Sequence, residues 1–402
     1  MDTISFRCTA SLRSIAILTV CVAVLATVPP AFAETPKEGS GGPEAPLEPA
    51  CALLDDNDVR QRMDGLLLKL LIMCDRADEL GQVRQSPAIE PVTGEAGGTD
   101  VPVSDPGGDV GTNSHTQSET SMAVNEATGT ICAGYNDSWH YFGENEGFTG
   151  FSRSVDGGAT FDDRGALGDN SFGDPAVVWR RSDGNFYFAA LHTNGLGIWG
   201  STDDCATYEF IGMIHTGGGD DKELMAVDNN PESPYYGRLY VQWTDFSAGG
   251  LWSTASDDGG LTWSTPVRIS DPGADVQGVW PAVAPNGDVY AAWVRDRSSG
   301  PIDIEVTRST DGGVTFSRVT NPITDKTIPR DAAATSACGR VALRGNIRYL
   351  PSPQIVIGPD GVLHVVYSYD PDGINTGDVV DVFYRRSTDS GATWDPEVRL
   401  ND

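Results

Sequence analysis

One short polar phrase recurs along the chain and limits what the chain can fold into. The pattern S-x-D-x-G-x-T, followed by an aromatic residue, begins at Ser154, Ser256, Ser309 and Ser387. A fifth copy begins at Ser201 and carries Cys205 at the fifth position of the pattern, where the other four copies carry glycine. Successive copies start 47 to 78 residues apart, a period that suits one supersecondary unit per repeat.

The chemistry of the phrase predicts a tight turn between two strands. An aspartate can accept hydrogen bonds from the backbone N–H groups that follow it, and glycine permits a positive φ. Threonine favours the return to a strand, and the aromatic residue anchors the hairpin in the core. We therefore interpret the aspartates as structural and disfavour a metal-binding role for them. They are Asp156, Asp203, Asp258, Asp311 and Asp389.

A second pattern precedes each copy of the phrase: a pair of strand-like segments with turn residues between them. These pairs cover residues 121–137, 175–191, 224–245, 281–296 and 354–370. Adding the strands on either side of the turn gives four strands per repeat, which is the composition of a propeller blade.

The phrase resembles the Asp-box (BNR) repeat of the β-propellers of the sialidase/neuraminidase superfamily. The resemblance implies an all-β, sialidase-like β-propeller of the six-bladed type, with five recognisable four-stranded blades between residues 112 and 402. For the remaining blade we expect a truncated reading frame, with the last blade missing after Asp402. Closure by the N-terminal segment or by a partner is the alternative.

The first 111 residues show three changes of composition. Residues 1–33 have an apolar run from Ile15 to Val28 and the small residues Ala31 and Ala33, which predicts a cleaved signal peptide and a secreted or periplasmic protein. Residues 34–52 are a linker rich in Pro, Gly and Glu, predicted to be disordered. Leucines at helical spacing predict a short helical segment over 53–81, most simply a structural cap, and 82–111 form a second linker.

Five cysteines remain after export. Cys51 and Cys74 lie in one short segment, so we expect them to form a disulfide in an oxidising compartment. Cys132, Cys205 and Cys338 lie far apart and cannot all pair, so at least one is expected to be a buried thiol. No C-x-x-C motif occurs, which argues against a cysteine zinc site.

The chain is strongly acidic, with a formal net charge of −30. A surface of this sign repels nucleic acid and anionic lipid, so we expect no nucleic-acid partner. No segment after the predicted signal is apolar enough to cross a bilayer, so we expect no membrane span. No cofactor is predicted. Calcium is the alternative left open, at residues 217–223 and 369–378, where oxygen donors gather, although solvated acidic loops explain both stretches more simply.

Candidate functional residues lie in the loops that begin each blade or follow its second strand, since these loops converge on a propeller's channel. Carboxylates there could act as acid and base on a sugar, and aromatic rings could stack on it. The predicted catalytic residues are Glu223, Asp245 and Asp296. The predicted substrate-binding residues are Arg295, Arg297, Glu119, Asp174, Trp139, Tyr141, Trp280 and Tyr369. Simple capping of strand ends is the alternative for Asp245 and Asp296.

The resemblance implies an arginine cluster that holds a substrate carboxylate, a tyrosine nucleophile paired with glutamate, and an aspartate acid/base. This chain departs from the family in lacking the R-I-P stretch of the opening blade. Arg295 and Arg297 are the candidate anion anchors instead. The sequence thus predicts a secreted propeller that recognises a glycan or glycoconjugate, with exo-glycosidase activity of the exo-α-sialidase type. The alternative is a non-catalytic propeller that binds proteins or cell-surface polymers.

Overall fold

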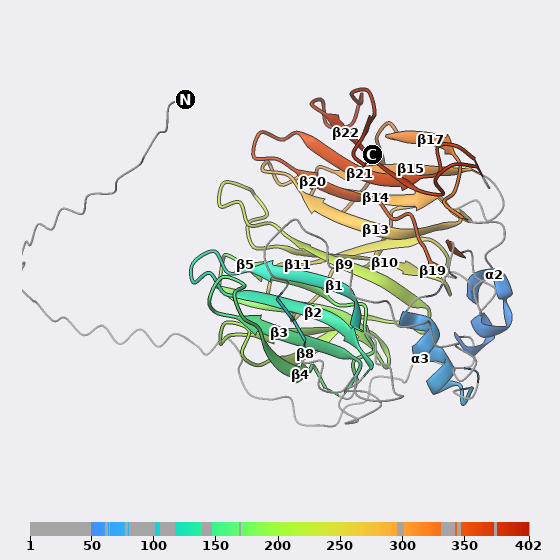
Figure 1. Cartoon of the computed structure of the whole chain (residues 1–402). Helices are drawn as coiled ribbons and strands as arrows, with labels where there is room; N and C mark the ends of the chain where they lie inside the picture. The colour runs from blue at the N-terminus through green and yellow to red at the C-terminus, as the bar shows by residue number, and fades with distance from the viewer. Residues whose placement is uncertain are drawn as a thin grey trace, which may run out of the picture. The chain divides into compact units, whose positions relative to one another are not determined.

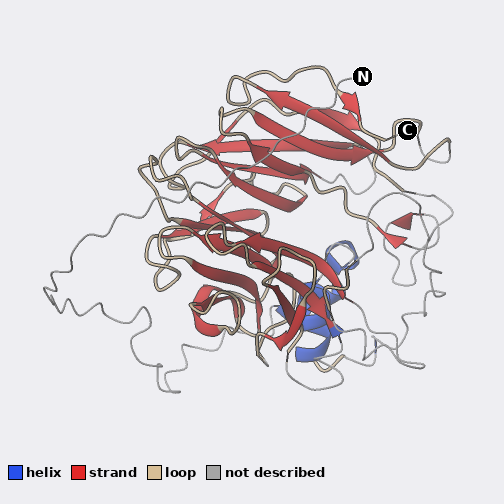
Figure 2. Ribbon diagram, turned by 60° about the vertical axis from the view of Figure 1, so that its left-hand side comes forward, coloured by secondary structure: helices blue, strands red, loops and turns tan. Residues whose placement is uncertain are grey.

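Antiparallel β-strands make up almost all of the regular secondary structure in the described part of the chain (Figure 2). The structure, a computed structural model, describes residues 50–60, 63, 65–76, 79, 101–104, 117–138, 147–168, 170–295, 301–330, 342–343, 347–373 and 376–401. The predicted signal peptide, most of both linkers and Cys338 lie outside these residues. Among the described helices, none has both the length and the apolar character needed to cross a membrane.

Five sheets follow one another in chain order, each built from four consecutive antiparallel strands (Figure 1). Sheet one contains β1 (Gln117–Val124), β2 (Ile131–Asp137), β3 (Thr149–Ser154) and β4 (Asp162–Ala166). Sheet two contains β5 (Ala176–Arg180), β6 (Asn185–His192), β7 (Gly195–Ser201) and β8 (Glu209–Thr216). Sheet three contains β9 (Asp220–Val227), β10 (Leu239–Asp245), β11 (Leu251–Ser256) and β12 (Val267–Arg268).

The last two sheets keep the same plan with one addition. Sheet four contains β13 (Val276–Val283), β14 (Val289–Arg295), β15 (Ile302–Ser309) and β16 (Ser317–Arg318), and β17 (Ile323–Lys326) also pairs with β15. Sheet five contains β20 (Gln354–Ile357), β21 (Leu363–Tyr369), β22 (Asp381–Ser387) and β23 (Val398–Arg399). Between them, β18 (Ala342–Leu343) and β19 (Ile347–Arg348) form a separate hairpin.

The first strand of each sheet lies beside the first strand of the next, in the order β1, β5, β9, β13 and β20. Apolar side chains fill the space between consecutive sheets, and one cluster joins Ile198 of sheet two to Leu239 of sheet three. Both faces of an inner strand are therefore covered, which is why β6 is buried along its whole length. This is the arrangement of blades in a β-propeller. The predicted fold class is confirmed.

The five segments that carry the recurrent phrase, here called the repeat turns, share one hydrogen-bond pattern. The aspartate Oδ1 accepts from the serine hydroxyl and from the threonine N–H at 2.7–2.9 Å, and its Oδ2 accepts from the threonine hydroxyl at 2.6–2.7 Å. The serine Oγ accepts the N–H of the fifth residue at 2.8–3.0 Å. That residue has a positive φ in every copy, 66° at Cys205 and 86–89° at the four glycines.

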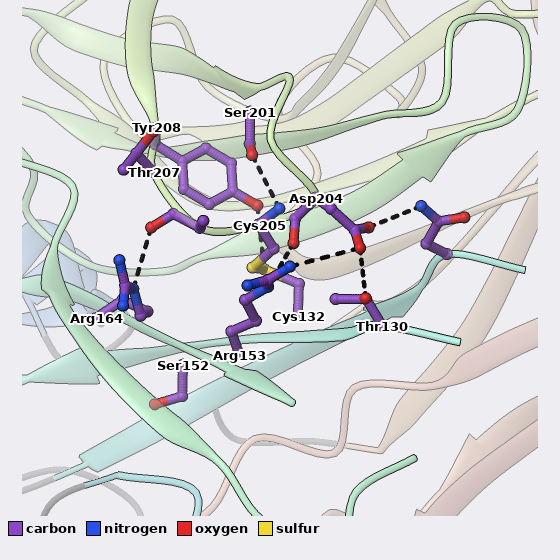
Figure 3. The surroundings of a disulfide bond; sticks show 12 residues. Thr130, Cys132, Ser152, Arg153, Arg164, Ser201, Asp204, Cys205, Thr207 and Tyr208 are labelled. Carbon is purple, nitrogen blue, oxygen red and sulfur yellow. Dashed lines mark hydrogen bonds and ion pairs between the residues drawn. A yellow bond between two sulfur atoms is a disulfide. The ribbon is translucent and has the colours of Figure 1, made fainter. Parts of the chain in front are cut away.

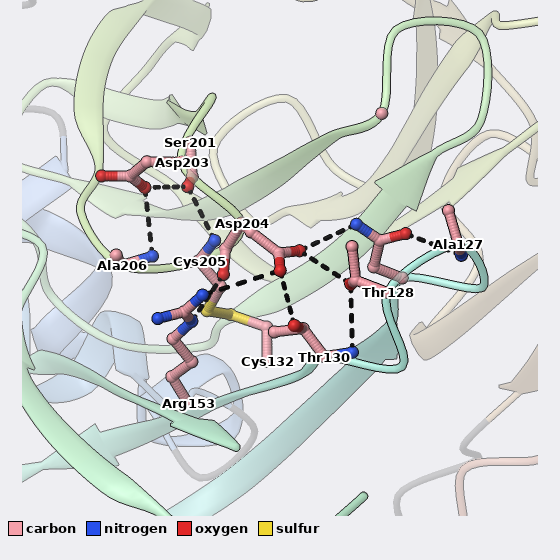
Figure 4. A network of polar contacts seen from close by, with 12 residues as sticks. Ala127, Thr128, Thr130, Cys132, Arg153, Ser201, Asp203, Asp204, Cys205 and Ala206 are labelled. Carbon is pink, nitrogen blue, oxygen red and sulfur yellow. Dashed lines mark hydrogen bonds and ion pairs between the residues drawn. A yellow bond between two sulfur atoms is a disulfide. The ribbon is translucent and has the colours of Figure 1, made fainter. Parts of the chain in front are cut away.

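Three of the repeat turns each accept a hydrogen bond from an arginine of the preceding sheet. In each case a guanidinium donates to a backbone carbonyl in the turn at 2.7–2.9 Å, and the pairs are Arg153 with Asp204, Arg180 with Asp257 and Arg238 with Gly312. The side chain of Asp204 adds bonds from Asn125, Thr128 and Thr130 of sheet one (Figure 4). The repeat turns therefore join neighbouring sheets as well as closing their own hairpins.

A disulfide between Cys132 and Cys205 explains why the second copy of the phrase differs from the others (Figure 3). Cys132 lies in β2 of sheet one, and Cys205 lies in the repeat turn of sheet two. In the next two turns, a Cβ added at Gly260 or Gly313 would lie 3.1–3.2 Å from a side chain of the preceding sheet. The cysteine side chain points the same way, so it reaches the neighbouring sheet and bonds to it. These two cysteines are thus not free thiols.

The helical segment contains η1 (Ala52–Asp55), α2 (Asn57–Arg60) and α3 (Gly65–Met73). The predicted disulfide between Cys51 and Cys74 is confirmed, with the Cα atoms 5.8 Å apart. The N–H of Leu66, in the first turn of α3, donates to Asp221 Oδ1 at 3.0 Å. A carboxylate of sheet three therefore satisfies one of the free N–H groups at the start of this helix.

Acid should weaken the repeat turns over a defined pH range. Hydrogen bonds from Thr393 and Ser387 lower the pKa of Asp389 to about 2, well below its ordinary value of 3.8. A carboxyl whose pKa is lowered by folding stabilises the protein above its ordinary pKa and loses that contribution as the pH falls towards the lowered value. We expect Asp389→Asn to lower the free energy of unfolding at pH 6 but not at pH 2, as measured by urea denaturation at each pH. An equal loss at both pH values would contradict this assignment.

Candidate functional site

A bulge recurs near the start of the first strand in four of the sheets. In sheet one, Glu119 and Thr120 lie opposite the single residue Tyr135. The equivalent pairs in sheets two to four, each opposite one residue of the second strand, are Asp174 with Pro175, Lys222 with Glu223, and Gly278 with Val279. The first residue of each pair has a left-handed backbone, with φ values of 53°, 52°, 54° and 68°.

Three of these left-handed positions carry a charged side chain. A residue other than glycine in this conformation costs about 1–3 kcal/mol. Glycine avoids that cost, as Gly278 does in sheet four. Bulges and strained residues are enriched at functional sites, so Glu119, Asp174 and Lys222 become the first candidates for functional side chains.

The four bulges surround one pocket with a volume of about 150 Å³. Ser352, just before β20, brings the fifth sheet to the same pocket. The site therefore lies where the first strands of all five sheets meet. Its lining residues are Glu119, Thr120, Asp174, Pro175, Lys222, Glu223, Leu224, Gly278, Val279, Trp280 and Ser352.

Lys222 links the charged groups of the pocket. Its Nζ donates to Glu119 Oε2 at 2.6 Å, and its backbone N–H donates to Asp174 Oδ2 at 3.2 Å. Burial opposes a charge on the lysine, but the carboxylates of Glu119 and Asp174 outweigh it and raise the pKa of Lys222. The lysine is therefore an ammonium at neutral pH.

Glu119 has a carboxyl group that gains and loses its proton close to neutral pH, and its ionised form is the one that pairs with the Lys222 ammonium. Burial is the main cause that raises the pKa of Glu119 to about 8, and the charge of Asp174 and a hydrogen bond to it add to the rise. Lys222 opposes the shift without cancelling it. The protonated form of Glu119, favoured below about pH 8, can donate a proton.

Glu223 lies deeper, with only 1% of its surface exposed. Neither of its carboxyl oxygens has a hydrogen-bond partner among the described residues. Burial raises the pKa of Glu223 well above its ordinary value, and the charges of Asp174 and Asp221 act in the same direction. A neutral carboxyl at the wall of the pocket can donate one hydrogen bond and accept another.

The structure brings four of the sequence-predicted site residues together. Glu119, Asp174, Glu223 and Trp280 all line the pocket, although they come from four different sheets. Three others lie away from this lining. The carboxylate of Asp245 accepts N–H bonds from Ser247 and Ala248 at 2.8 Å, and so it closes the turn after β10.

Arg295 and Tyr369 are held in networks of their own. The guanidinium of Arg295 donates to Glu305 at 2.7 Å and to Asp271 at 3.1 Å, which satisfies it within sheet four and its neighbouring loop. The hydroxyl of Tyr369 donates to Glu397 at 2.7 Å, and that carboxylate also accepts from Tyr367. Burial raises the pKa of Tyr369, with a further rise from Glu397, so the pair does not produce a phenolate.

Other predicted site residues cannot be compared with the pocket. Trp139, Tyr141, Asp296 and Arg297 lie outside the described residues. The five aspartates of the repeat turns are described, and none of them belongs to the pocket lining.

Lys222 lies in one of the blade-entry segments from which candidates were chosen but was given no role, and Gly278 and Ser352 were not chosen. A signal for them exists in the sequence. When the first strands are aligned on ETSMAV, DPAVVW, KELMAV, GVWPAV and SPQIVI, the column of their first letters contains Glu119, Asp174, Lys222, Gly278 and Ser352. All five residues of this column line the pocket.

No protein-family model matches the chain, and no curated protein matches it. Solved structures are similar to it at low identity. The intramolecular trans-sialidase of Ruminococcus gnavus shares 14% identity over 71% of this chain and 85% of its own, with a TM-score of 0.47. A protein of unknown function from Dyadobacter fermentans shares 18% identity over 71% and 83%, with a TM-score of 0.44. The α-L-arabinanase of Penicillium chrysogenum shares 13% over 69% and 80%, also at 0.44.

Proposed function

We propose that this chain is a carbohydrate-binding propeller whose pocket holds one neutral sugar residue at the end of a glycan. One observation carries the proposal: five sheets each bring a residue to a single small pocket that combines a partly exposed tryptophan with several hydrogen-bonding groups. Sugar binding needs both features, because a pyranose has apolar ring faces and a rim of hydroxyl groups. The pocket volume of about 150 Å³ suits a single sugar ring.

The charges of the pocket favour a neutral sugar over a sialic acid. Among the described residues that line the pocket, none is an arginine, the side chain whose planar fork suits a carboxylate. The lysine there already bonds to Glu119. Glu119, Asp174 and Glu223 supply carboxyl oxygens, which pair well with sugar hydroxyls but poorly with another carboxylate.

A second function, hydrolysis of a terminal sugar, is favoured by the protonation of Glu119. A general acid must hold its proton at the working pH, and the pKa of Glu119 is about 8. Here Glu119 protonates the leaving oxygen as the glycosidic C–O bond breaks, a water molecule adds to the anomeric carbon, and the proton that this water loses returns to Glu119. Against this function, the carboxyls of Glu119 and Asp174 share a hydrogen bond, whereas the two carboxyls of glycosidases usually lie about 5–9.5 Å apart.

A glycan array and a set of fluorogenic glycosides test both functions on the mature chain. We expect the array to retain the chain on glycans that end in neutral sugars. Release of fluorophore from a neutral glycoside would add hydrolysis to recognition. Binding confined to sialylated glycans, or turnover of a sialoside alone, would contradict the neutral-sugar proposal. Either result would instead support an activity of the exo-α-sialidase type. Failure to bind any glycan, with no turnover, would favour a propeller that binds proteins.

A further inference from the structure

Two buried aspartates face each other at the paired ends of β9 and β10. Asp220 begins β9 and Asp245 ends β10, and the two are directly opposite in the antiparallel pairing. Asp220 is 0% exposed and Asp245 is 6% exposed. Like charges at directly opposite positions destabilise a sheet, and burial increases the repulsion because water no longer screens it.

A histidine completes this cluster from the neighbouring sheet. His215 lies near the end of β8, and its Nδ1 lies 2.8 Å from Asp220 Oδ2. One ligand atom from each of His215, Asp220 and Asp245 lies within 4.8 Å of the other two. Two ligand atoms that are each about 2.1 Å from one metal ion lie about 3–4 Å from each other. A single ion therefore fits among these three side chains if their ligand atoms move slightly closer together.

One carboxylate oxygen of the cluster is left without a hydrogen bond from the described part of the chain. Asp220 Oδ1 is buried and has no hydrogen-bond partner among the described residues. The two N–H bonds to Asp245 both go to Oδ1, which fixes the orientation of that carboxylate as an outer shell fixes a metal ligand. Lys69 of α3 is the nearby buried cation, but its Nζ makes no hydrogen bond to a described residue.

We propose that His215, Asp220 and Asp245 form a binding site for one divalent transition-metal ion, with Zn²⁺ the expected occupant. A mixed set of one imidazole and two carboxylates suits Zn²⁺ or Mn²⁺, whereas Ca²⁺ takes oxygen ligands. The ion would hold the end of β8 in sheet two against β9 and β10 of sheet three. Asp220 lies two residues before Lys222, at the start of the strand that supplies two of the pocket's four charged residues. The inference does not depend on sugar binding.

Metal content measured on the full mature chain tests this site. The chain is stripped with a chelator, incubated with Zn²⁺, Mn²⁺ or Ca²⁺, passed through a desalting column and analysed by mass spectrometry for metal. We expect about one Zn²⁺ or Mn²⁺ per chain and a rise in Tm with either ion. Cobalt in the same site should give visible absorption bands of nitrogen and oxygen ligation.

Variants separate this site from unspecific binding to an acidic surface. His215→Ala and Asp245→Asn should each weaken Zn²⁺ binding at least about tenfold, by analogy with the effect of losing groups around metal sites. His364→Ala and Glu232→Gln, which remove a histidine and an exposed glutamate outside the cluster, should leave it unchanged. If Asp245→Asn fails to fold, the wild-type stoichiometry and the His215→Ala variant still decide the question. Retention of no transition metal by the wild type, or equal retention by His215→Ala, would overturn the proposal.

Discussion

Removal of the Cys132–Cys205 disulfide is expected to lower the free energy of unfolding by about 4 kcal/mol, from the entropy of closing a loop of this length. The two cysteines are 73 residues apart in sequence, and they join the first two sheets, which are otherwise held together by side-chain contacts. The variant that tests this is Cys132→Val combined with Cys205→Gly. Glycine is the residue of the four other repeat turns at this position, so the turn itself should keep its positive φ.

Urea denaturation of the double variant and the wild type measures the difference directly. A matched control is Cys51→Ser with Cys74→Ser, which opens the shorter 23-residue loop and should cost about 3 kcal/mol on the same basis. The wild type treated with a reductant should lose more stability than the double variant, because the Cys51–Cys74 disulfide opens as well. A double variant within about 1 kcal/mol of the wild type would show that the disulfide adds little beyond the Arg153 and Asp204 contacts.

Glu119→Gln is expected to have the largest effect on chemistry at the pocket. If the chain hydrolyses a glycoside, the variant should lose about 10²–10⁴-fold in kcat, which is the usual contribution of a general acid. In the wild type, kcat/KM should fall as the pH rises through about 8, because Glu119 then loses its proton. Glutamine cannot donate that proton, but it keeps the shape of the side chain. Sugar affinity should therefore change little.

The titration of Glu119 can be followed whether or not the chain cleaves a substrate. We expect a carboxyl carbon signal in NMR spectra that titrates near pH 8 in the wild type and is absent from Glu119→Gln. Glu209→Gln, at an exposed position of β8, should keep that signal and any activity. A Glu119 signal that titrates near the ordinary pKa of glutamate, 4.5, would remove the basis for its acid role.

The periodicity of the sequence was sufficient to predict the blades. Each repeat turn has its own local signal, because the aspartate, glycine and threonine satisfy one another within eight residues and need no distant partner. The strand pairs were readable for the same reason, since alternating segments flank short turns in all five repeats. The sequence did not predict β17, a fifth strand paired with β15 in sheet four.

The pairing of Cys132 with Cys205 could not be predicted from spacing, because 73 residues separate them and a third distant cysteine offered other pairings. The repeat itself contained the missing information. At the turn position of Cys205, a Cβ atom points towards the preceding sheet. This becomes visible only in the structure, by comparison with the glycines at the same position of the other turns.

The candidate site was predicted in part. The loops that begin each blade gave Glu119, Asp174, Glu223 and Trp280, because a propeller's connectivity places those loops on one channel. Arg295 was also selected from its position along the chain, but Glu305 and Asp271 hold its guanidinium elsewhere. Such pairings join residues that are 10 and 24 positions apart on different segments, and residue type alone does not reveal them.

The most direct test of the pocket is the affinity of the chain and its Trp280→Ala variant for the saccharide that an array identifies, measured by calorimetry. Truncating an aromatic residue at the centre of a binding site typically costs about 2 kcal/mol or more, so we expect the Kd to rise at least about 30-fold. Trp263→Ala, in the repeat turn of sheet three, removes an equal side chain outside the pocket lining and should bind as the wild type does. Equal affinities for wild type and Trp280→Ala would contradict the claim that the meeting point of the five first strands is the sugar-binding site.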